Sequence, residues 1–76
     1  MATDHAKEVI VSLMQAVCNH SRAIDALEHH LHTVPSSLND NQRASRSAVL
    51  TIAISLVSAE RDRAIEAVRL AFEAAE

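Results

Sequence analysis

Three histidines near the middle of the chain come closest, in residue type and spacing, to a metal site. They are His29, His30 and His32, and the acidic residues Asp25 and Glu28 precede them. In a helix, Asp25 with His29 and Glu28 with His32 would each offer two ligands on one face. The sequence has no HExxH or CxxC motif and no further ligand at a recognised spacing. We therefore predict no metal and no cofactor, and we interpret the histidines as a polar helix end that complements the helix dipole.

Catalytic and phosphate-binding motifs are also missing from the sequence. The chain contains no glycine, so it can form neither a sharp turn that exposes a nucleophilic serine nor a glycine-rich phosphate loop. The formal net charge is −3, and the basic residues are spread among acids, which argues against a general nucleic-acid-binding surface. A small basic patch at Arg43 and Arg46 keeps RNA binding open as an alternative. We expect a protein that is not an enzyme.

Composition predicts an all-α protein with one domain over residues 1–76. Of the 76 residues 49% are hydrophobic, but only one is aromatic and one is proline, a profile typical of long helices. The single cysteine, Cys18, lies in an apolar run, and we interpret it as a buried, inert thiol in a reducing, cytoplasmic setting. The apolar runs 9–18 and 48–59 are shorter than the roughly 20 residues that span a bilayer. We expect neither a transmembrane helix nor a signal peptide.

An unbroken heptad pattern organises the first half of the chain. Residues at alternating steps of four and three form a seam: Ala6, Ile10, Leu13, Val17, His20, Ile24, Leu27, Leu31 and Val34. His20 is the one polar member, and we interpret it as a residue that sets register, with a pH-sensitive switch as the alternative. The pattern predicts a helix over about 4–33, because Pro35 ends it. A turn over about 34–39 and a second helix over about 40–75 follow.

The second helix carries two apolar stripes. The first should face helix 4–33 and has an extra four-residue step after Arg61; it comprises Leu50, Ile54, Val57, Arg61, Ile65, Val68, Phe72 and Ala75. The second lies nearly opposite. A lone antiparallel two-helix hairpin covers only one stripe, so we predict a homodimer whose hairpins form a four-helix bundle. The expected dimer interface is Val9, Met14, Cys18, Val49, Ile52, Leu56 and Ala59.

Reversal of the chain near Pro35 sets an expected register. Thr3 should then lie beside Arg69, and His20 beside residues 51–55. The second helix would outrun the first by roughly 10 Å. The partner-binding residues that we predict on this overhang are Arg69, Leu70 and Phe72.

These features together favour a small regulatory protein that acts by binding another protein. An inhibitor, antiactivator or adaptor could occlude a surface of a larger partner by helix packing. Two alternatives remain: an RNA-binding four-helix bundle that uses the Arg43 and Arg46 patch, and a purely structural oligomerisation module. The sequence does not identify the partner.

Overall fold

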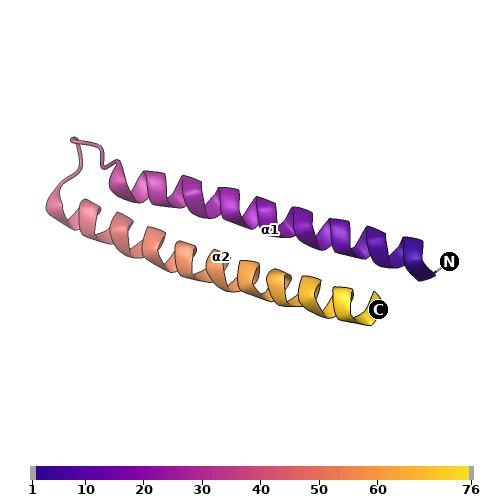
Figure 1. Ribbon diagram of the computed structural model, residues 1–76. Helices are drawn as coiled ribbons and strands as arrows, with labels where there is room; N and C mark the ends of the chain where they lie inside the picture. The colour runs from indigo at the N-terminus through magenta and orange to yellow at the C-terminus, as the bar shows by residue number, and fades with distance from the viewer. Residues whose placement is uncertain (1, 76) are drawn as a thin grey trace.

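The chain folds as two long antiparallel helices. A computed structural model describes residues 2–75, with side-chain surroundings for residues 4–74. Helix α1 spans Ala2–His32 and helix α2 spans Asp40–Ala75. The two helices lie side by side along their length, and the molecule measures 59 × 14 × 12 Å (Figure 1). The expected all-α hairpin is confirmed.

A capping box at Asn39 starts α2. The backbone N–H of Gln42 donates a 2.8 Å hydrogen bond to Asn39 Oδ1, and the backbone N–H of Asn39 donates a 3.0 Å hydrogen bond to Gln42 Oε1. This reciprocal pair satisfies two amide groups that the first helical turn leaves without a partner. Asn39 is therefore the N-cap of α2, one residue before the helix begins.

The predicted seam of α1 faces α2. Ile10 and Ile24 are its most enclosed members, at 9% and 6% exposure. The other members that are shielded to an intermediate degree are Ala6, Leu13, Val17, His20, Leu27 and Leu31. Val34 is the exception, at 47% exposure. Because α1 ends at His32, ahead of Pro35, Val34 lies in the turn and does not continue the seam.

The seam of α2 differs from our expectation after Arg61. Ile65 and Phe72 were placed on it, but they are 49% and 53% exposed. Ala64 and Ala71 are shielded in their place. The seam therefore keeps one heptad period throughout, over Leu50, Ile54, Val57, Arg61, Ala64, Val68 and Ala71. Two seams with the same 3.5-residue period stay in contact along a shared axis, whereas an extra step would rotate one of them away.

The register also differs from the expected one. Met14, Val17, Ile65 and Val68 line one groove, so Val17 lies level with residues near 64. Counting back along α2, His20 lies level with Arg61 rather than with residues 51–55. The start of α2 therefore projects beyond the end of α1, and at the other end the N-terminus of α1 extends past α2 (Figure 1). Our expectation that α2 outruns α1 there is wrong, because it assumed a symmetric turn.

We predict that Ile24→Ala lowers the free energy of unfolding by about 3 kcal/mol, because truncating an enclosed isoleucine removes apolar contacts and leaves a cavity. Urea unfolding followed by circular dichroism at fixed protein concentration measures this. The matched control is Ile65→Ala at a half-exposed position of α2, where a much smaller loss is expected. Equal losses at the two positions would contradict the assigned seam.

Candidate functional site

Much of the apolar surface of the hairpin faces solvent, because each helix has only one neighbour. Among the side chains that the structure describes, only Ile10 and Ile24 are nearly enclosed. The large apolar side chains that stay exposed are Val9, Val11, Met14, Val34, Val49, Ile52, Leu56, Ile65, Leu70 and Phe72. Contiguous exposed apolar surface marks sites of association with other molecules. The candidate site is therefore a set of binding surfaces.

The first surface, here called the groove face, lies between the two helices. An open depression of about 230 Å³ is lined by Met14, Val17 and Cys18 of α1 and by Ile65 and Val68 of α2. Phe72 follows Ile65 by two helical turns and so continues the same side of α2. Both helices contribute to this surface, and its lining is apolar. It has the form of an open hydrophobic groove between two helices.

The second surface, here called the α2 outer seam, consists of Val49, Ile52, Leu56 and Ala59. All four are exposed, and Val49 and Leu56 are among the most exposed large apolar side chains, at 65% and 64%. At 100° per residue, Leu56 and Ile65 lie roughly 180° apart around α2. The α2 outer seam and the groove face therefore point in opposite directions.

The seven residues that we predicted for one dimer interface are thus divided between different sides of the hairpin. Met14 and Cys18 border the groove face, whereas Val49, Ile52, Leu56 and Ala59 form the α2 outer seam. Val9 precedes Met14 by five residues, which places it roughly 140° away around α1. Sequence reasoning grouped them because all seven lie off the seam. Cys18 is exposed, so our interpretation of it as a buried thiol is wrong.

The predicted partner-binding residues do not form a single patch. Arg69 and Phe72 are three residues apart and lie on neighbouring sides of α2, while Leu70 and Phe72 lie roughly 160° apart. All three are exposed. The C-terminal end of α2, which carries them, lies alongside α1 and forms no overhang (Figure 1). Sequence reasoning missed Ile65 as a surface residue, because it assigned Ile65 to the seam.

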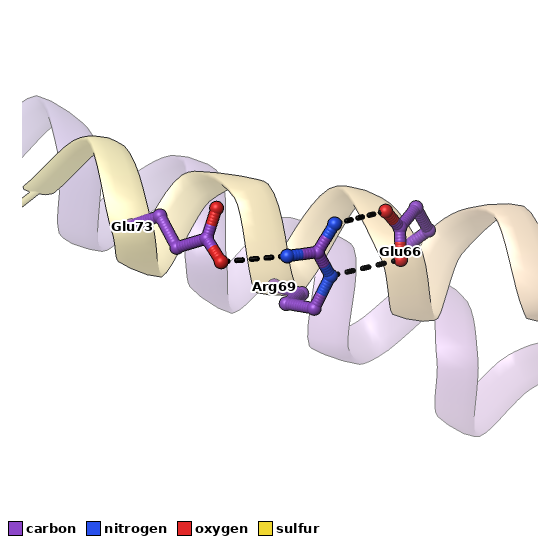
Figure 2. A network of polar contacts seen from close by, with 3 residues as sticks. All are labelled: Glu66, Arg69 and Glu73. Atoms are coloured by element: carbon purple, nitrogen blue, oxygen red, sulfur yellow. Dashed lines mark hydrogen bonds and ion pairs between the residues drawn. The ribbon is translucent and has the colours of Figure 1, made fainter.

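The Arg69 guanidinium is held between two carboxylates of its own helix. Its Nε donates a 3.0 Å hydrogen bond to Glu66, Nη2 donates a second bond to Glu66, and Nη1 donates a 2.6 Å bond to Glu73 (Figure 2). The hydrogen bonds from Arg69 lower the pKa of Glu66, partly opposed by desolvation and assisted by the positive charge. The trio holds the Arg69 guanidinium along the exposed side of α2.

We predict that the Glu66 carboxyl titrates below its ordinary value of 4.5. Because its folded pKa is lowered, the stabilisation from this pair is present above the unfolded value and is lost as the pH falls through the folded value. Carbon-detected NMR titration of the carboxyl measures the shift. Arg69→Gln should return the pKa of Glu66 towards the ordinary value, and 1 M salt should weaken the shift. An unchanged titration in Arg69→Gln would contradict the assignment.

A polar layer interrupts the middle of the hairpin seam. Within residues 4–74, the buried side-chain nitrogen or oxygen atoms without a hydrogen-bond partner are His20 Nδ1 and Arg61 Nε. Arg61 Nε lies 3.7 Å from Asp62 Oδ1, an ion-pair distance. The register places the imidazole and the guanidinium at the same level. The sequence predicted His20 as the polar residue of the α1 seam. It did not predict that Arg61 lies opposite His20, because that depends on the register between the helices.

We predict that His20→Leu raises the free energy of unfolding by about 1 kcal/mol, because it removes an enclosed nitrogen that lacks a partner. Thermal and urea unfolding at pH 7 measure the change. His29→Leu, at an exposed position of the same helix, is the control and should leave the stability nearly unchanged. A lower stability of His20→Leu would indicate that the polar layer contributes to folding.

The polar residues near the turn do not assemble a metal site or a broad basic surface. In the part of the chain that the structure describes, no group of three His, Cys, Asp or Glu residues is placed to hold a metal ion. The rings of His29 and His30 meet edge to face, 5.9 Å apart. Arg46 Nη1 donates a 2.5 Å hydrogen bond to the His30 carbonyl oxygen, which ties one of the two predicted basic residues to the end of α1. Arg43 is exposed.

Neither described helix combines the length and the apolar character needed to cross a membrane. Comparison of the chain with protein-family models, with curated proteins and with solved structures gives no match.

Proposed function

We propose that this chain is a small non-enzymatic regulatory protein that acts by binding another protein through helix packing. The observation that carries the proposal is the exposure of large apolar side chains on two opposite sides of a fold this small. Each Å² of apolar surface left in water forgoes about 25 cal/mol relative to burial. A helix of another protein that packs on such a surface would bury it and recover this free energy.

The groove face is the proposed docking surface for the partner. Phe72 is the single aromatic residue of the chain, and aromatic residues beside an arginine dominate the binding energy at many interfaces. Met14 supplies a flexible, polarisable side chain that adapts to a partner. An amphipathic helix of the partner would place apolar side chains between Met14 and Ile65. Such binding would occlude that helix and so inhibit or redirect the larger protein.

The same proposal includes self-association of two hairpins into a four-helix assembly. The α2 outer seam and the groove face cannot both be covered by one neighbour, because they point in opposite directions. Self-association through one surface therefore leaves the other available. A dimer would carry two copies of the remaining surface, so it could engage a symmetric partner.

Two other functions compete with this one. An RNA-binding bundle would use Arg43 and Arg46, but these two are the only Lys or Arg residues between positions 23 and 60, and the other basic residues are spread among acids. A purely structural oligomerisation module would need only the self-association surface. The groove face favours protein binding over both, because neither alternative uses it.

Capture from extracts of the source cells, with the tagged wild type and the Phe72→Ser variant, tests the proposal. We expect the wild type to enrich a protein that Phe72→Ser loses at least tenfold, with both forms equally helical. Enrichment should survive nuclease treatment and 0.5 M salt, because apolar packing is not screened, whereas RNA binding weakens steeply with salt. The matched control is Ser55→Ala, which lies off the groove face. Capture that depends on nucleic acid, or that is the same for Phe72→Ser, would overturn the proposal.

A further inference from the structure

We propose that the α2 outer seam is the self-association surface and that a second copy of the chain packs on it antiparallel. The inference rests on the dimer included in the proposed function and assigns its interface. The groove face, with Met14, Cys18 and Ile65, then stays uncovered in the dimer.

The spacing along the outer side of α2 repeats that of a helix-packing seam. Residues 45, 49, 52, 56, 59 and 63 follow alternating steps of four and three, which is the heptad period of the hairpin seam itself. This second seam extends over about 27 Å at 1.5 Å per residue. No Asp, Glu, Lys or Arg occurs in residues 47–59. The outer side of α2 is therefore suited to packing against another helix.

The second seam is complementary to itself when two copies run antiparallel. A two-fold axis between Ile52 and Leu56 places each of these residues opposite the other in the second copy. The same axis places Val49, a larger side chain, opposite the small Ala59, and Ser45 opposite the long Arg63. Every layer on one side of the axis therefore recurs on the other side with the two copies exchanged. This is the condition for an interface that one surface forms with its own copy.

Charges that flank the second seam favour the antiparallel orientation. Arg46 and Glu60 lie on the same flank, seven residues to either side of Ala53. Antiparallel packing brings Arg46 of each copy near Glu60 of the other, giving two attractive pairs. Parallel packing in register would set this flank against the opposite flank of the other copy, where Arg46 and Glu60 meet uncharged residues and form no ion pair. The Arg46 guanidinium uses Nη1 for the His30 carbonyl and keeps other N–H groups for a carboxylate.

This arrangement makes the two α2 helices the centre of the assembly and the two α1 helices its outer layers. The contact involves one helix from each copy, so its area lies at the small end of specific interfaces. Dimerisation is accordingly expected to depend on protein concentration in the micromolar range.

Sedimentation equilibrium tests the assignment with single charged residues on each surface. Leu56→Glu should weaken dimerisation at least tenfold, because it places a carboxylate at the centre of the second seam. The matched control is Ile65→Glu on the groove face, which should dimerise like the wild type. The double variant Ile52→Glu with Leu56→Lys should dimerise more tightly than Leu56→Glu. Antiparallel packing sets position 52 of one copy opposite position 56 of the other, so each glutamate would face a lysine. Circular dichroism confirms that each variant remains helical.

Cysteine crosslinking with a short bismaleimide tests the orientation independently. Ser55→Cys in a Cys18→Ser background should crosslink to a dimer, because residue 55 lies next to the two-fold axis. The wild type, whose only thiol is Cys18, should not crosslink. A wild-type crosslink combined with loss of dimerisation in Ile65→Glu would overturn the assignment and place the second copy on the groove face. A wild type that stays monomeric at 200 µM would overturn the dimer itself, and partner capture through Phe72 would remain a separate result.

Discussion

One constraint governs this molecule: each of its two long helices has only one neighbour within the chain. A helix in a hairpin can shield a single stripe of side chains, and the structure fills that stripe with a continuous heptad seam on α1 and on α2. Most of the large apolar side chains beyond the seam stay exposed to water. The thin core, the exposed groove face and the exposed α2 outer seam all result from the single neighbour that each helix has.

Most of the fold could be predicted from the sequence, because it depends on local signals. The α1 seam consists mainly of aliphatic residues in one period, and Pro35 limits how far the helix extends. On α2 the reasoning went wrong after Arg61, where it preferred Ile65 and Phe72 to Ala64 and Ala71. Hydrophobicity alone favours Ile65 and Phe72 as the residues that face α1. The heptad period of the α1 seam instead places Ala64 and Ala71 there. The Asn39 and Gln42 spacing was a capping signal that the sequence did contain.

The candidate site was less predictable, because it depends on the register between the helices. No local rule states where α2 begins relative to the end of α1, and the assumed symmetric turn misplaced the levels of His20, Arg69 and Phe72. The groove face exists only because residues 14–18 of α1 lie beside residues 65–68 of α2. The angular position of a residue around its helix, in contrast, follows from its sequence number alone. This angle already places Ile65 on another side of α2 than the α2 outer seam.

The stagger between the helices has a consequence for how the chain closes on itself. The seam residues nearest the turn are Leu31 and Leu50, so the first seam contact joins residues about 19 positions apart, although the turn between the helices has only seven. For a flexible segment each doubling of the loop adds about 0.6 kcal/mol of closure entropy. The capping box at Asn39 favours the helical state of the residues that follow it, so it shortens the flexible part of this loop. A local hydrogen-bond pair thereby eases a long-range contact in which it takes no part.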